Sequence, residues 1–318
     1  MIKGKIGHFM CLRSQYLFKI VMFLLACGMF GGLKYPCHKF TEGFSLFKIT
    51  HPLESEGPFS PPELSVVEKE LLLQTLSQPF HYLSHGGQVY VFMSEDEQYV
   101  LKFVKFQRLR VAPWIQKLPL PKILLTKQLM KAQKRARILK KMYQSYDNAY
   151  RAFKEETAIL YHHLQLTKDL KKSVVLFDKL GYRYDIDLDQ YAFVVQKKGI
   201  PTDKLIKLLI QEGKIEEACL KLDQLIEFVV AAAKKGIDDQ DIKFKANLGF
   251  RDNRVIQLDM GSLRINHQQQ DRAIYLPKIH QAGLKFCGWL EKNAPQLVGH
   301  FVQSLEQLQK DSADLDQA

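Results

Sequence analysis

The sequence from residue 80 onward contains short apolar runs separated by polar turns. Residues 80–93 hold two such runs around a glycine turn, and residues 99–104 form a third, so this part predicts a three-stranded meander. Two later runs, at residues 173–177 and 191–196, predict further strands on either side of an acidic, aromatic turn. We therefore expect a five-stranded antiparallel sheet in this part of the chain.

Apolar residues at helical spacing predict helices before, within and after this sheet. One helix is expected at residues 150–164, and a break at residues 197–201 precedes a helical region. The pattern predicts an α+β protein with two lobes, a sheet lobe with one helix at residues 63–197 and a small, mostly helical lobe at residues 198–318. The other helices are expected at residues 63–76, 203–211, 215–234, 273–292 and 295–310.

Residues 1–34 form a hydrophobic N-terminal segment. Residues 16–33 are apolar except for Lys19 and a few small or polar positions, and the uncharged part, residues 20–33, is 14 residues long. This is shorter than the roughly 20 residues of a spanning helix and is typical of a signal-peptide core. A short membrane anchor in which Lys19 snorkels to the surface also fits. Cys27 lies in a stretch that resembles a bacterial lipoprotein cleavage box, and a buried core segment is a further alternative.

A linker is expected at residues 35–62, because prolines are frequent there and no apolar period is present. The chain of 318 residues carries a formal net charge of +12, which suggests an anionic partner. Its five cysteines are scattered and include no Cys-x-x-Cys pair, which argues against a disulfide framework or a zinc site.

Much of the positive charge lies in a basic insert at residues 107–147. Residues 98–146 contain 13 Lys or Arg and no Asp or Glu, and apolar residues at helical spacing in segment 127–141 predict an amphipathic helix. Three uses are open for this helix: a solvated face, docking on an anionic membrane surface, and nucleic-acid binding. The hydrophobic N-terminal segment favours the membrane over nucleic acid.

Two oxygen-bearing side chains flank a predicted hairpin later in the chain. Asn247 precedes a short apolar run, a polar turn follows, and the next strand ends in Asp259, Met260 and Gly261. Such a hairpin would bring Asn247 and Asp259 together at one end. An amide oxygen beside a carboxylate is the kind of site that Mg²⁺ prefers. The alternative is a surface hairpin that carries acids without binding a metal.

The predicted sheet offers a matching phosphate site. Gly86 and Gly87 at the first turn would let backbone N–H groups approach a phosphate closely. Lys102 on the third strand would reach the same phosphates, and Glu156 on the helix expected at residues 150–164 would reach Lys102. The alternatives are an ordinary meander with Lys102 in solvent and a solvated acid at Glu156.

The order of these features, over residues 80–261, resembles the protein-kinase-like superfamily. The resemblance implies a bilobal fold that uses ATP and Mg²⁺. Lys102, which follows Val-Leu, is similar to the strand-three Lys of the family and would contact the α- and β-phosphates, with Glu156 as its helix partner. Asn247 is similar to the metal-binding Asn, and Asp259, in Asp-Met-Gly, is similar to the Asp-Phe-Gly aspartate that holds Mg²⁺.

The same resemblance implies a catalytic base. Asp241 is the best match for the catalytic-loop Asp that orients the acceptor hydroxyl. No His-Arg-Asp is present, however, and the equivalent residues read Asp-Gln-Asp, from Asp239 to Asp241. Asp241 lies six residues before Asn247, one more than is usual, so Asp239 is its rival.

No Ala-Pro-Glu follows Gly261, and only residues 262–318 remain. This resembles the atypical bacterial members of the superfamily, which act on sugars, lipopolysaccharide cores or other small acceptors. Three functions follow as hypotheses: an ATP-dependent phosphotransferase, a catalytically inactive pseudokinase that binds or scaffolds, and a basic protein that binds membranes or nucleic acid. For a kinase we expect an uncleaved N-terminal anchor with the kinase-like part in the cytoplasm, and export is the alternative.

Overall fold

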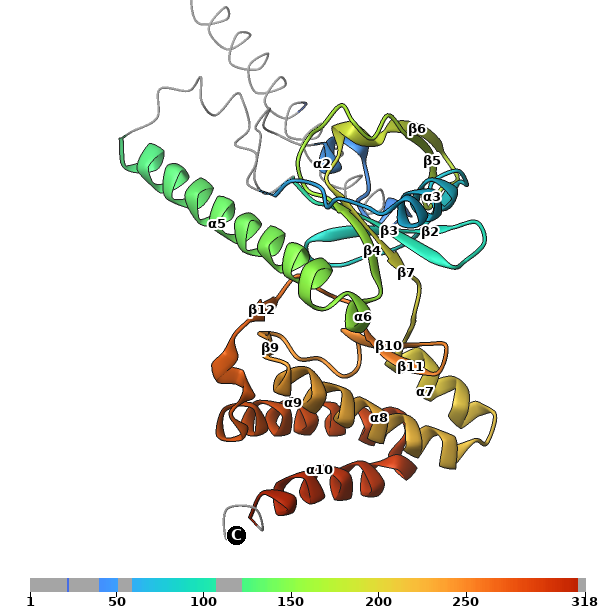
Figure 1. Ribbon diagram of the computed structural model, residues 1–318, viewed down its shortest axis with the longest axis vertical. Helices are drawn as coiled ribbons and strands as arrows, with labels where there is room; N and C mark the ends of the chain where they lie inside the picture. Colours follow the sequence, from blue (N-terminus) through green and yellow to red (C-terminus); the bar gives the residue numbers. More distant parts are fainter. Residues whose placement is uncertain (1–21, 23–39, 51–58, 107–121, 314–318) are drawn as a thin grey trace, which may run out of the picture.

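The computed structural model describes residue 22 and residues 40–50, 59–106 and 122–313 (Figure 1). A sheet lobe lies above a helical lobe, and one long helix runs along the side of the sheet lobe and projects outward. The N-terminal segment apart from residue 22, much of the linker and residues 107–121 lie outside the described residues. Among the helices that are described, none has both the length and the hydropathy needed to cross a membrane.

The sheet lobe contains seven strands in the order β4-β7-β3-β2-β1-β5-β6. Neighbouring strands pair antiparallel except β1 and β5, which run parallel. The expected five-stranded antiparallel sheet is therefore wrong in its strand number and in one pairing. The strands are β1 (Phe80–His85), β2 (Val89–Ser94), β3 (Tyr99–Val104), β4 (Ile159–His163), β5 (Ser173–Phe177), β6 (Arg183–Asp187) and β7 (Phe193–Lys197).

The two additional strands come from segments whose local pattern favours another structure. β4 was part of the helix expected at residues 150–164, but Ala158 has a left-handed φ of 50° and ends the helical turn directly before it. β6 lies in the segment that reads as an acidic turn, and its charged, mostly exposed residues suit the edge of a sheet. Pairing with β7 makes β4 a strand, and pairing with β5 does the same for β6, because strand formation depends strongly on neighbouring strands.

In the part of the chain that the structure describes, four helices accompany the sheet. Ser65 caps the start of α3 and forms a capping box with Glu68, which satisfies backbone N–H groups at the helix start. α5 buries Met142, Tyr146 and Ala149 in a cluster shared with the sheet and with the chain that follows Asp259. The helices are α2 (Leu46–Ile49), α3 (Val66–Thr75), α5 (Lys122–Ala152) and α6 (Lys154–Thr157).

The helical lobe is built around its own apolar core. α8 contributes Leu222 and Leu225, and α9 and α10 contribute Phe286 and Phe301, which pack edge to face. The helices lie where the helical spacing of the sequence predicts them, and the α+β class is confirmed. They are α7 (Thr202–Gln211), α8 (Ile215–Lys234), α9 (Arg272–Asn293) and α10 (Val298–Ala313), with short 3-10 turns η1 (Leu188–Gln190), η2 (His267–Gln270) and η3 (Pro295–Leu297).

Short strands lie between the two lobes. The hairpin of β10 and β11 pairs with β8, which lies at the end of the break expected at residues 197–201. β9 pairs with β12, so the chain forms a new strand almost immediately after Gly261 and enters α9 at Arg272. These strands are β8 (Ile200–Pro201), β9 (Ile237–Asp239), β10 (Leu248–Arg251), β11 (Arg254–Gln257) and β12 (Leu263–Ile265).

Gly249 allows β10 to approach β8 closely. A Cβ atom at this position would lie 2.6 Å from the Ile200 carbonyl oxygen, which is fixed in the backbone. We expect Gly249→Ala to lower the free energy of unfolding by about 2–3 kcal/mol, because the strands must separate to make room. The matched control is Gly288→Ala, where a Cβ meets nothing within 4 Å inside helix α9. There the free energy of unfolding should rise by about 0.5–1 kcal/mol; chemical denaturation of both variants measures the two effects, and equal effects would contradict the packing argument.

Candidate functional site

A cleft of about 680 Å³ lies between the sheet lobe and the helical lobe. Strands β1, β2 and β3 form its upper wall, and the break at residues 197–201 forms its back. Asn247 and the segment from Leu258 to Met260 line the opposite side. Of the residues expected to bind nucleotide or metal, Gly86, Lys102, Asn247 and Asp259 are brought together here.

Lys102 enters this cleft from β3. Its side chain is buried, and its Nζ donates a hydrogen bond to the Leu258 carbonyl oxygen at 2.5 Å. Burial lowers the pKa of the Lys102 ammonium to about 8, and the nearby Asp259 carboxylate limits this decrease. The cleft therefore holds the buried ammonium group of Lys102 beside the Asp259 carboxylate. This ammonium group is hydrogen-bonded to the neutral carbonyl of Leu258.

The β10–β11 hairpin brings Asn247 and Asp259 to the same end, as the sequence predicts. The Asn247 carbonyl oxygen accepts hydrogen bonds from the Leu258 and Asp259 N–H groups at 2.6 and 3.3 Å. The Asn247 Nδ2 donates to the Asp241 carbonyl oxygen at 2.8 Å, which fixes the orientation of the side-chain amide. Asn247 and Asp259, each with a side-chain oxygen, therefore line the same cleft.

The glycine turn reaches over this pair. Gly86 lines the cleft, its N–H donates to the Val89 carbonyl oxygen at 3.0 Å, and Lys105 Nζ donates to its carbonyl oxygen at 2.7 Å. A Cβ at Gly87 would meet nothing within 4 Å, so this position is open. From the same turn, Gln88 contacts the Asp-Met-Gly segment: a Cβ at Gly261 would lie 2.8 Å from its Oε1 atom.

The two candidate bases, Asp239 and Asp241, differ sharply in environment. The Asp239 carboxylate accepts hydrogen bonds from Ser262 Oγ at 2.7 Å, Gln257 Nε2 at 2.9 Å and the Asp241 N–H at 2.9 Å. Burial raises the pKa of this carboxyl group, and the Asp259 charge adds to the increase. The Asp241 side chain is 51% exposed and pairs with Lys243 Nζ at 2.5 Å. The Asp239 carboxylate thus bonds to the loop at Asp241, to β11 at Gln257 and to Ser262, whereas the Asp241 carboxylate is exposed to solvent.

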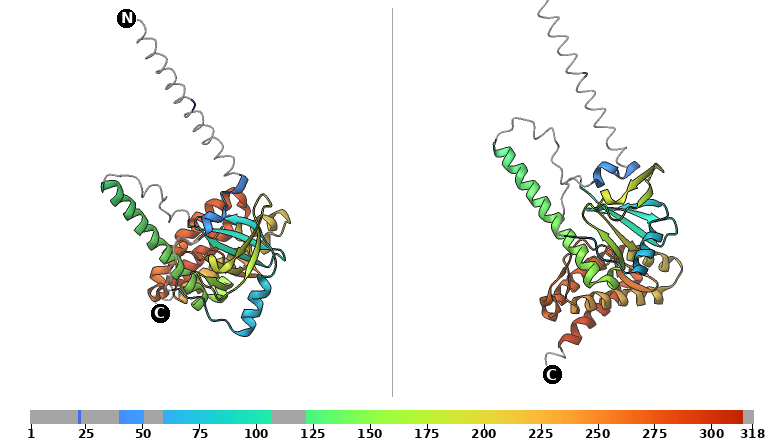
Figure 2. Two further views of the ribbon diagram at one scale, coloured as in Figure 1. Left: turned by 90° about the horizontal axis from the view of Figure 1, so that it is seen from above. Right: turned by 45° about the horizontal axis from the view of Figure 1, so that its top comes forward.

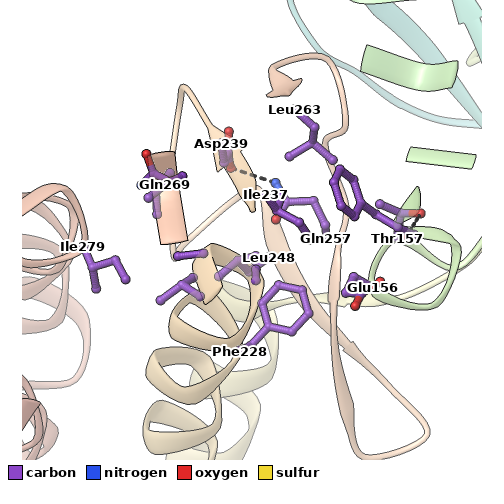
Figure 3. Close-up of a pocket in the computed structure, with 15 residues that line it drawn as sticks. Glu156, Thr157, Phe228, Ile237, Asp239, Leu248, Gln257, Leu263, Gln269 and Ile279 are labelled. Atoms are coloured by element: carbon purple, nitrogen blue, oxygen red, sulfur yellow. Dashed lines mark hydrogen bonds between the residues drawn. The ribbon is translucent and has the colours of Figure 1, made fainter. Parts of the chain in front are cut away.

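Glu156 does not meet Lys102. It lies on the short helix α6 and forms an ion pair with Lys235. It lines a separate, smaller cavity of about 30 Å³ together with Phe228 and Asp239 (Figure 3). The expected partnership with Lys102 assumed that a helix over residues 150–164 packs on the sheet, and the chain instead turns into β4 after Thr157.

Helix α5 occupies the position beside Lys102 instead, and it places Tyr146 in the wall of the cleft. Tyr146 is buried, and burial together with the Asp259 charge raises the pKa of its phenol. The preceding residue, Ser145, donates a hydrogen bond to the Met260 carbonyl oxygen and accepts one from the Leu263 N–H at 2.6 Å. The sequence signal for this contact was the helical spacing of Met142, Tyr146 and Ala149, directly after the basic segment.

No known protein-family model matches this chain, and no curated protein matches it. Among solved structures it is similar to the bifunctional kinase-methyltransferase WbdD, with 13% identity over 73% of this chain and 46% of that chain and a TM-score of 0.33. The ROP18 kinase domain in complex with AMP-PNP and sucrose shows 17% identity over 58% of this chain and 51% of that chain, with a TM-score of 0.34. The complex of Rv3197 with erythromycin from Mycobacterium tuberculosis shows 14% identity over 75% and 60% of the two chains, with a TM-score of 0.32.

The chain thus spans less than two thirds of each of these structures. A sheet lobe presents Lys102 from its third strand, a short break follows, and a helical lobe presents Asn247 and Asp259 to the same cleft. This two-lobed arrangement is the one that the resemblance of the sequence to the protein-kinase-like superfamily implies.

Proposed function

We propose that the protein is an ATP-dependent phosphotransferase that uses Mg²⁺ and transfers the γ-phosphoryl group to a hydroxyl on a sugar, lipid or small molecule. The observation that carries the proposal is the convergence of Lys102, Asn247 and Asp259 on one cleft. Mg²⁺ is held in proteins by one or two carboxylates together with substrate phosphates. The oxygens of Asn247 and Asp259 fit this pattern.

Each residue has a distinct task in this proposal. Lys102 binds the α- and β-phosphates and offsets their charge, while the turn at Gly86 and Gly87, which carries no side chains, lets the backbone approach the phosphates from above. Asn247 and Asp259 hold the metal, which supplies charge stabilisation to the transferring phosphoryl group when bound. Asp241, which does not itself line the cleft, is assigned to orient the acceptor hydroxyl and accept its proton, because its carboxylate is exposed to solvent.

The test is nucleotide binding and phosphoryl transfer by the full chain. Thermal unfolding with and without Mg-ATP measures binding, since a ligand that binds only the folded protein raises its stability. Hydrolysis of labelled ATP, and transfer to pooled sugar and lipid acceptors, measures the chemistry. If Mg-ATP neither stabilises the protein nor is turned over, the proposal is wrong.

A pseudokinase is the second candidate, because Glu156 pairs with Lys235 and leaves Lys102 without a helix glutamate. The Lys–Glu pair is a part that active protein kinases require. This candidate predicts stabilisation by nucleotide without any phosphoryl transfer. Transfer above the level of an Asp259 variant would exclude it.

The choice of Asp241 over Asp239 as the base gives a separate prediction. Asp241→Asn should lower the rate of phosphoryl transfer by about 10²–10⁴-fold, because general-base catalysis contributes this much, and should leave Mg-ATP binding unchanged. Asp239→Asn should mainly lower the thermal stability, since this half-buried carboxylate accepts three hydrogen bonds. A folded Asp239 variant without activity, beside an active Asp241 variant, would reverse the assignment.

A further inference from the structure

The N-terminal half of α5 projects beyond the body of the sheet lobe (Figures 1 and 2). Its side chains from residue 127 to 141 are mostly exposed, whereas the helix becomes buried from Met142 onward. Seven residues at spacings of three and four form one stripe along this half, which we name the basic stripe. They are Lys127, Met130, Lys131, Lys134, Arg137, Ile138 and Lys141.

The basic stripe combines positive charge with exposed apolar side chains. Five of its seven members are Lys or Arg, and residues 98–146 contain no acid that would neutralise them within this part of the chain. Met130 and Ile138 nevertheless remain 64% and 47% exposed. Leu129, next to the stripe, is 64% exposed as well. These apolar side chains gain nothing from contact with water, whereas burial against an apolar phase would be favourable.

This composition identifies the partner by its chemistry. A helix with Lys and Arg beside apolar side chains lies in the plane of a membrane interface, with the cations at the headgroups and the apolar groups at the acyl boundary. Binding to a nucleic-acid backbone would be favoured by the cations alone, because phosphate contacts are electrostatic. Met130 and Ile138 therefore distinguish the two partners.

We propose that the basic stripe is a docking surface for an anionic lipid membrane. The surface rests on α5 and does not depend on phosphotransferase activity. It ends at Lys141, one helical turn before Ser145, which bonds to the Asp-Met-Gly segment. Docking would therefore hold the nucleotide cleft close to the lipid surface.

The experiment is flotation of the full chain with vesicles. Phosphatidylcholine vesicles containing about 30% phosphatidylserine carry the negative surface potential that attracts basic segments. Pure phosphatidylcholine vesicles report any binding that does not depend on charge, including binding by other parts of the chain. We expect preference for the anionic vesicles, and about 1 M salt should abolish this preference because screening then acts within about 3 Å.

Two variants with the same change in net charge locate the binding. The stripe variant combines Lys127→Glu, Lys134→Glu and Lys141→Glu, and should lose at least about 100-fold in partitioning onto anionic vesicles, at about five-fold for each basic residue. The control variant changes three exposed lysines elsewhere, by Lys69→Glu, Lys285→Glu and Lys310→Glu. It should retain the preference, and its loss in the control or its retention in the stripe variant would overturn the proposal.

A third variant separates membrane from nucleic acid. Met130→Ser with Ile138→Ser should lower partitioning onto anionic vesicles by about ten-fold, because apolar burial is lost, and should leave binding to a DNA duplex unchanged. If vesicle binding is unaffected while the stripe variant loses duplex binding, the stripe is a nucleic-acid site and the proposal is wrong.

Equal thermal midpoints of all variants confirm folding, and the salt titration of the unaltered chain remains decisive if a variant unfolds. Stripe-dependent binding by a protein without activity would refute the phosphotransferase proposal alone.

Discussion

Asp259→Asn is expected to reduce phosphoryl transfer by at least about 10³-fold. The substitution keeps the size of the side chain and the acceptor for the Gly261 N–H, which Asp259 Oδ1 bonds at 3.0 Å. Among the described residues that line the cleft, it removes the one carboxylate. Losing a preorganised group that stabilises developing charge costs about 10²–10³-fold, and a metal supplies several kcal/mol of such stabilisation.

The measurement has two parts. Initial rates of labelled-phosphate transfer give the change in activity, and thermal unfolding gives Mg-ATP binding. At about 100 times its Kd a ligand stabilises the folded protein by about 2.7 kcal/mol, and this gain should require Mg²⁺ in the unaltered protein and disappear in the variant. Asp252→Asn is the matched control, because Asp252 is an exposed acid at the tip of the same hairpin. A variant at Asp259 that retains magnesium-dependent stabilisation would remove this residue from the metal site.

Lys102→Met is expected to raise the free energy of unfolding and to weaken the binding of nucleotide. The pKa of Lys102 is lowered by burial to about 8, below the unfolded value of about 10.4. Folding therefore weakens proton binding, so the stability of the unaltered protein increases with pH between about 8 and 10.4. At pH 7 the buried charge costs roughly 3 kcal/mol. Loss of the hydrogen bond to the Leu258 carbonyl lowers the free energy of unfolding by about 1 kcal/mol, so a net gain of about 2 kcal/mol in stability remains.

Chemical denaturation at two pH values checks this. The variant should be more stable than the unaltered protein at pH 7 and lose most of its advantage near pH 10.5, where Lys102 is neutral in the folded chain and about half neutral in the unfolded chain. Lys285→Met, at an exposed position on α9, should change the stability by less than about 0.5 kcal/mol. Binding of Mg-ATP should weaken by about 100-fold in the Lys102 variant, since charge-assisted hydrogen bonds to phosphate are lost. Equal stability at pH 7 would show that the charge is not costly in its site.

The parts of the site that the sequence predicted are those set by local pattern. Alternating apolar residues around a polar turn fix the β10–β11 hairpin, and the hairpin brings Asn247 and Asp259 together without help from distant residues. Lys102 follows from the same argument, because the meander of β1, β2 and β3 is continuous in sequence. Helices α7 and α8 were similarly predictable from their apolar spacing.

The parts that were missed depend on contacts between distant segments. Glu156 was placed opposite Lys102 because an apolar run after it reads as helix, yet pairing with β7 turns that run into β4. The basic segment before Met142 concealed that the end of the same helix is buried against Met260. The choice between Asp239 and Asp241 needed the hydrogen bonds of Ser262 and Gln257, which no spacing rule supplies.

The short path from Gly261 to α9 has a consequence for regulation. β12 pairs with β9 only two residues after Gly261, and η2 and α9 follow without an intervening loop. The described chain therefore provides no swinging segment at this point that phosphorylation could order or release, which is how protein kinases are commonly switched. For the phosphotransferase proposed above, activity would then depend on nucleotide, on where the protein resides and on which acceptors it meets there.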